Sequence, residues 1–182
     1  FKNMEFPSTQ LVMFKSLSFY MSVESFENTF IAADKVVEEE EMAYRDTWRA
    51  EDPYFYKTGR LFYHYEQLTL KGYPGRATFT FSKSHRLEEA TVHIPVTSKV
   101  EQKVVLNNLS QTIKKELEEL PDYQSMTTDT LGIYDDGYRY KVKLKGQQWE
   151  LWVDVYPTEN KYATDTETDK YTIRVDQFLM YP

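Results

Sequence analysis

The sequence predicts an α+β protein in which two main helices pack on one face of antiparallel sheet. Two stretches place apolar residues at helical spacing, and each is followed by runs in which apolar and polar residues alternate. Short turn signals separate the alternating runs, and no strand–helix–strand rhythm requires a parallel sheet. The 182 residues fit a single domain over 1–182, whose two helix–meander halves, 17–95 and 98–182, suggest an internal duplication.

The first half is expected to begin with a helix over residues 22–43. Ser22 is a suitable N-cap, and Glu24 suits the positive end of the helix dipole. The apolar stripe of this helix consists of Val23, Phe26, Phe30, Ala33 and Val37. Strands are predicted over 60–70, 77–81 and 87–94, joined by a turn at 71–75 and another near 82–86.

The second half is expected to begin with a helix over residues 99–120. Ser98 and Glu101 have the spacing of a capping box, and Pro121 lies at the expected helix end. The apolar stripe consists of Val105, Leu109, Ile113, Leu117 and Leu120. Strands are predicted over 138–144, 149–156 and 171–175, with a polar loop over 157–169.

The hairpin of residues 138–156 shows the clearest alternation in the chain. A turn at Gly146 places Lys143 opposite Glu150, Arg139 opposite Asp154 and Lys141 opposite Trp152. The face with these charges is expected to be solvated, with a cation–π contact at Trp152. The residues expected to be buried under a helix are Tyr140, Val142, Leu144, Trp149, Leu151 and Val153.

Composition excludes several classes of function. The chain has no cysteine, which excludes disulfides, thiolate metal centres and a cysteine nucleophile. Its 22 basic and 29 acidic residues give a net charge of −7, so nucleic acid is not an expected partner. No apolar run is long enough to span a bilayer.

The motifs of known catalytic sites are also absent, so no enzyme activity and no cofactor are expected. His64 and His93 could form a two-ligand metal site if their strands were neighbours. Asp165, Glu167 and Asp169 alternate with threonines, but they lack the glycine of a calcium-binding loop. No metal site is therefore predicted.

Three features are candidates for partner binding. The segment 34–52 holds eight acids and three bases, which suits either a docking surface for a basic partner or a solvated helix end and loop. A basic stripe lies along 139–145, and the many aromatic residues cannot all be buried. The predicted partner-binding residues are Trp48, Tyr54, Tyr56, Lys141 and Trp152.

Residues 17–26, Leu-Ser-Phe-Tyr-Met-Ser-Val-Glu-Ser-Phe, resemble the opening of small bacterial exported proteins and lipoproteins. The segment 72–81 followed by Leu87 is similar to their strand–turn–strand unit. Examples are the β-lactamase-inhibitor-protein-like repeat and small outer-membrane assembly lipoproteins. The chain departs from this pattern at Tyr20, where glycine is usual, and in its long acidic segment after Val37.

The resemblance implies a binding or scaffolding role and supplies no catalytic residue. The first residue is Phe1, which favours removal of a secretory signal, with an arbitrary boundary as the alternative. We therefore expect an exported or envelope-associated binding protein whose partner is a protein or other envelope component. The alternative is an intracellular acidic protein of the immunity or inhibitor type that masks a basic partner surface. The oligomeric state is not predicted.

Overall fold

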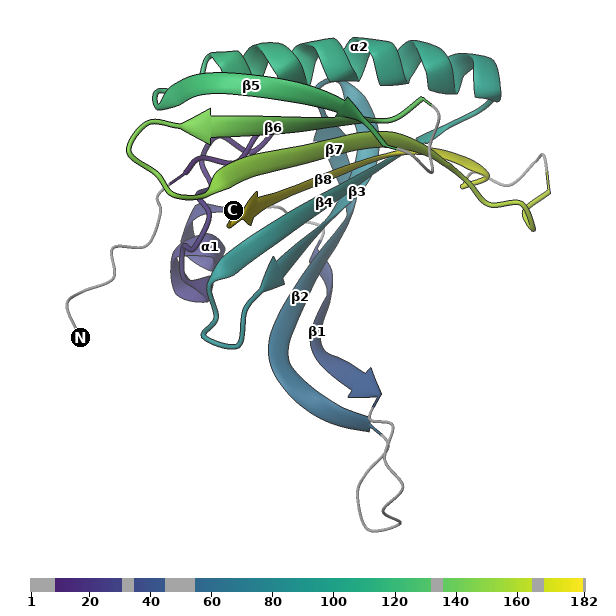
Figure 1. Ribbon diagram of the computed structural model, residues 1–182. Helices are drawn as coiled ribbons and strands as arrows, with labels where there is room; N and C mark the ends of the chain where they lie inside the picture. Colours follow the sequence, from purple (N-terminus) through teal and green to yellow (C-terminus); the bar gives the residue numbers. More distant parts are fainter. Residues whose placement is uncertain (1–8, 31–34, 45–54, 132–135, 165–168, 182) are drawn as a thin grey trace.

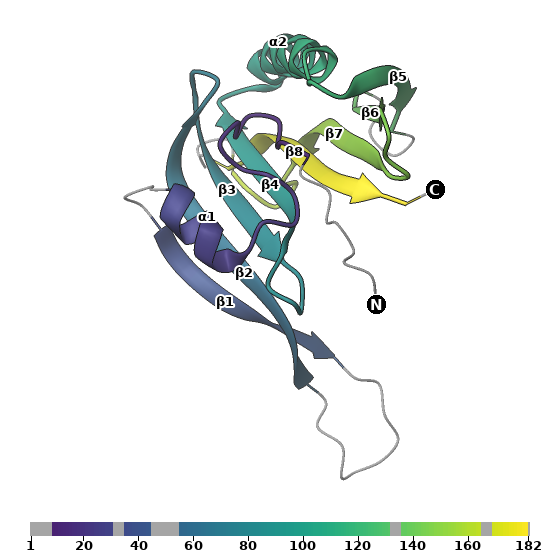
Figure 2. The same cartoon turned by 90° about the vertical axis from the view of Figure 1, so that its left-hand side faces the viewer.

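The computed structural model describes residues 9–30, 35–44, 55–131, 136–164 and 169–181, with the side chains of 35–44 and 55–58 left outside the description. These residues form one eight-stranded antiparallel sheet and two helices (Figures 1 and 2). The fold class is therefore α+β, as predicted. The elements are α1 (Val23–Thr29), β1 (Lys35–Tyr44), β2 (Phe55–Leu70), β3 (Tyr73–Phe81), β4 (Leu87–Val96), α2 (Lys99–Glu118), β5 (Tyr123–Thr130), β6 (Tyr138–Leu144), β7 (Glu150–Glu159) and β8 (Tyr171–Met180).

The strand order is β1-β2-β3-β4-β8-β7-β6-β5, which is two four-stranded meanders joined side by side. Within each meander consecutive strands pair, and the last strands of the two meanders, β4 and β8, pair with each other. Each half thus supplies one helix and four strands, where the sequence pattern indicated about three. The two missed strands, β1 and β5, are the edges of the sheet.

The prediction of a helix over 22–43 is correct only at its beginning. The Ser22 hydroxyl accepts a hydrogen bond from the Ser25 N–H at 3.1 Å, so Ser22 is the N-cap, but α1 ends at Thr29. Residues 35–44 pair instead with the long strand β2. β2 offers backbone partners along residues 55–65, so strand pairing overrides the helical spacing.

The second helix confirms its prediction closely. Ser98 caps it by accepting from the Glu101 N–H at 3.1 Å, and the predicted stripe from Val105 to Leu117 is buried. The Glu101 carboxylate accepts a hydrogen bond from the Thr97 N–H at 2.7 Å. A capping box would use the N–H of the next residue, Ser98. A hydrogen bond from the Thr97 hydroxyl and, to a smaller extent, the one from the Thr97 N–H lower the pKa of Glu101.

Turn chemistry also decides where the β2–β3 hairpin closes. Lys71 and Gly72 both have positive φ, 54° and 86°, so the connection is a two-residue turn. The breaker-rich residues that follow belong to β3. Gly75 passes so close to β4 that a Cβ there would lie 2.6 Å from the His93 carbonyl oxygen.

Both helices pack on the same face of the sheet, as predicted (Figure 2). The Phe26 ring of α1 lies 5.0 Å from the rings of Phe79 and Phe81. The Gln102 amide of α2 donates to the carbonyls of Thr158 and Thr172 at 3.0 and 3.1 Å. We call the opposite side of the sheet, which no described helix covers, the helix-free face.

An N-terminal segment that the sequence pattern did not place in the core covers the remainder of the helical side. Its buried residues are Leu11, Val12, Phe14, Leu17 and Phe19. It is held by Gln177, which is fully buried. The Val12 N–H donates to Gln177 Oε1 at 2.8 Å, and Gln177 Nε2 donates to the Val12 carbonyl at 2.9 Å.

The substitution Gln177→Leu should destabilise the protein by about 2–4 kcal/mol, because it leaves both polar groups of Val12 buried without a partner. The matched control Gln111→Leu removes an exposed amide from α2 and should change the free energy of unfolding by less than about 0.5 kcal/mol. Urea unfolding of both variants measures the difference. Equal stabilities would show that the Val12 contact does not hold the segment.

Candidate functional site

Two of the five predicted partner-binding residues lie together on the helix-free face. Lys141 of β6 is directly opposite Trp152 of β7, and the predicted register of this hairpin is confirmed at every pair. Trp48 and Tyr54 lie outside the described residues. Tyr56 lies in β2, at a position whose side chain is not described.

The centre of this site is the indole ring of Trp152, which is half-buried. The Lys141 ammonium and the Arg139 guanidinium each lie 4.7 Å from the ring centroid, in cation–π geometry. Phe178, directly across on β8, lies 6.0 Å from Trp152 between centroids. We call these four residues, Arg139, Lys141, Trp152 and Phe178, the Trp152 platform.

The cations of the platform are fixed by carboxylates on neighbouring strands. Arg139 donates two hydrogen bonds to Asp154, at 2.7 and 2.8 Å, and these bonds raise the pKa of Arg139. Lys141 forms an ion pair with Asp129 of β5 at 2.8 Å. Because both cations are held in place, the ring and its charged neighbours form a preorganised surface.

The charged side of the hairpin is less solvated than the sequence pattern indicated. Asp154 is only 6% exposed, and Asp176, directly across from it on β8, is 9% exposed. Arg174 and the Tyr156 hydroxyl bind Asp176 at 2.9 and 2.8 Å. Lys143, in contrast, lies opposite Glu150 without an ion pair to a described residue. Glu150 instead accepts from Trp152 Nε1 at 3.1 Å.

The sequence pattern missed Phe178 and Asp176 because the predicted last strand stopped at Val175. Alternation does not continue beyond Val175, because Gln177 on the inward side is polar and Phe178 on the outward side is apolar, so no periodic signal extended the predicted strand. Trp149 was expected under a helix but is only half-buried, since it precedes β7 and packs edge-on against Tyr181 at 6.0 Å. The other residues of that expected buried set are buried.

His93 lies near the centre of the helix-free face between two arginines. It is directly opposite Arg76 of β3 and Arg174 of β8. Burial, together with these two positive charges, lowers the pKa of His93 from 6.5 to about 4. His64 hydrogen-bonds Thr78 at 2.9 Å, and β3 separates its strand from that of His93, so the two imidazoles do not lie on neighbouring strands.

The described residues contain no group of three His, Cys, Asp or Glu side chains that could hold a metal ion. Asp165 and Glu167 lie outside the described residues, and Asp169 pairs with Arg76 at 3.2 Å. No helix among the described residues is long and apolar enough to cross a membrane.

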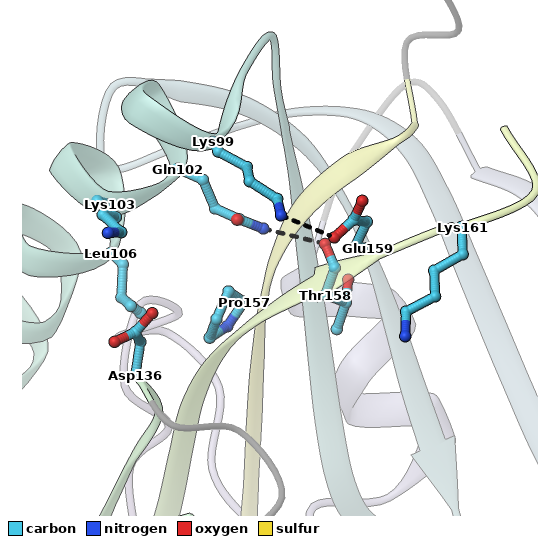
Figure 3. A pocket seen from close by; sticks show the side chains of 9 residues that line it. All are labelled: Lys99, Gln102, Lys103, Leu106, Asp136, Pro157, Thr158, Glu159 and Lys161. Atoms are coloured by element: carbon cyan, nitrogen blue, oxygen red, sulfur yellow. Dashed lines mark hydrogen bonds and ion pairs between the residues drawn. The ribbon is translucent and has the colours of Figure 1, made fainter. Parts of the chain in front are cut away.

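A separate pocket of about 660 Å³ lies on the helical side, between the first turns of α2 and the end of β7 (Figure 3). Lys99 pairs across it with Glu159 at 3.5 Å. Leu106 and Pro157 supply apolar surface, and Asp136 adds a second acid. Its mixed charges suit a small polar molecule, but it does not include a predicted site residue.

Comparison of the chain with described protein families, with curated proteins and with solved structures finds no match.

Trp152 and its sequence neighbour Leu151 point to opposite faces and form a matched pair of variants. Leu151 is fully buried, so Leu151→Ala should cost about 2–5 kcal/mol of stability. Trp152→Ala removes the cation–π contacts and the tilted ring contact with Phe178 at a half-buried site, and it should cost about 1–2 kcal/mol. Denaturant unfolding compares them. A larger loss for Trp152→Ala would identify that ring as a structural residue.

Stability should fall as the pH is lowered from 6.5 towards 4. In this range the unfolded chain protonates His93 while the folded chain keeps the ring neutral, so protons favour unfolding. After allowance for solvent screening at this partly exposed site, the loss should be about 1–2 kcal/mol. His93→Gln should flatten this part of the pH–stability curve, whereas the control His85→Gln, at an exposed turn, should leave it unchanged. Identical curves for His93→Gln and the parent protein would contradict the assignment.

Proposed function

We propose that this chain is a non-enzymatic binding protein, exported or envelope-associated, that binds a protein partner through the Trp152 platform. The observation that carries the proposal is the half-buried Trp152 ring, in cation–π contact with two fixed cations on the face that no described helix covers. Tryptophan and arginine are the residues that most often dominate binding energy at protein interfaces.

Preorganisation strengthens this interpretation. Binding costs free energy when flexible side chains must be ordered, and Arg139 and Lys141 are already held by Asp154 and Asp129. Phe178 adds aromatic surface next to the ring. Lys143, which has no ion-pair partner among the described residues, leaves one cation beside the platform for an acidic group of the partner. The resemblance of residues 17–26 and 72–81 to exported binding proteins is consistent with this role.

The alternative function, an acidic protein that masks a basic partner surface, is favoured by one feature of the fold. The glutamates 38–41 belong to β1, an edge strand of the sheet, and not to a helix end. This alternative predicts binding that depends on β1 and weakens steeply with salt. The proposed function predicts binding that depends on Trp152.

Site-specific photo-crosslinking in extracts of the native host separates these possibilities. A photoreactive residue at Lys143, exposed beside the platform, should capture one protein, and the same probe at Gln111 on α2 should not. Excess unlabelled protein should compete for the adduct, and excess Trp152→Ala protein should compete at least about tenfold less well.

Extracts are divided into envelope and cytosolic fractions, so the adduct also reports where the partner resides. Equal competition by the parent protein and Trp152→Ala would overturn the proposed site. An adduct found only in the cytosolic fraction would contradict the envelope association and favour the alternative.

A further inference from the structure

The backbone groups on the outer edge of β5 have no hydrogen-bond partner among the described residues. Every described backbone bond of residues 124–130 goes to β6, and no described side chain binds this edge. Most residues of the strand are exposed. A strand in this condition is a template for pairing with another strand.

The two edges of the sheet differ in how they discourage such pairing. β1 contains the four consecutive glutamates 38–41, which would place like charges together if two copies met there. β5 has neither lysine nor proline, and its only charged residue is Asp129. Its register shift lies at the beginning, between Tyr123 and Ser125, so the rest of the strand is regular.

We propose that β5 is the interface of a symmetric dimer, in which the β5 strands of two copies pair antiparallel about a two-fold axis at Thr127. This inference goes beyond the proposed function. With Thr127 opposite its own copy, Ser125 faces Asp129 and Met126 faces Thr128. No like charges then face each other, and a threonine pair lies at the centre, which is a favourable cross-strand contact.

The symmetry follows from the alternation of side chains. Thr127 lies opposite Lys141 within the chain, so it belongs to the helix-free face, and centring the axis on it keeps that face continuous across the dimer. Pairing offset by one residue would turn the second sheet over. The proposed dimer therefore displays two Trp152 platforms on one continuous surface, which allows bivalent binding.

Thr127→Asp tests the interface without disturbing the monomer. Within one chain the new carboxylate lies opposite Lys141, but in the dimer it faces its own copy across the axis. Sedimentation analysis should show a dimer for the parent protein and an increase of about tenfold or more in its dissociation constant for the variant. Thr69→Asp adds the same charge at an exposed position of β2, an inner strand, and should leave the dimer intact.

Thr127→Lys provides the decisive comparison. Alone it should also weaken the dimer, whereas an equimolar mixture with Thr127→Asp should form a heterodimer, because opposite charges then meet at the axis. Circular dichroism checks that both variants are folded. A monomeric parent protein throughout the accessible concentration range would overturn the proposal. A dimer unaffected by either substitution at Thr127 would overturn it as well.

Discussion

The pairing of β4 with β8 is the interaction on which the rest of the structure depends. It joins two meanders through a ladder that extends from Glu89 opposite Phe178 to Val96 opposite Tyr171. Because the register matches apolar with apolar positions, such as Val92 with Val175, the apolar faces of both meanders lie on one side. Both helices then cover that side, and the polar faces merge into one helix-free surface.

That surface is organised by charge neutralisation between strands. Asp154 and Asp176 face each other at the β7–β8 junction, and each is held by an arginine. Two carboxylates directly opposite each other, without cations, would destabilise the sheet. The ion pairs that prevent this also fix the positions of Arg139 and Arg174. The interactions that stabilise the sheet therefore also fix the Trp152 platform, so the proposed binding surface is rigid without a separate scaffold.

The accuracy of the sequence-based predictions followed the strength of burial. The hairpin from Tyr138 to Tyr156 was predicted pair by pair, because its inward positions are apolar and its outward positions, apart from Trp152, are polar or charged. β5 was missed because its residues are mostly polar and exposed, and β1 because its apolar residues continue a helical spacing. Of the candidate site, Lys141 and Trp152 could be identified from cross-strand spacing. Phe178 and Asp176 could not, because they reach the platform from a strand distant in sequence.

The sequence by itself determined the local elements with strong periodicity: α2 and its cap, the central strands and the side of each strand that is buried. Tertiary structure decided the fate of residues 35–44, whose helical spacing was overridden by the backbone partners of β2. It also decided the position of the N-terminal segment, which Gln177 anchors across 165 residues of sequence. Periodicity records which side of an element is buried, but which elements meet depends on backbone and side-chain partners far apart in the chain.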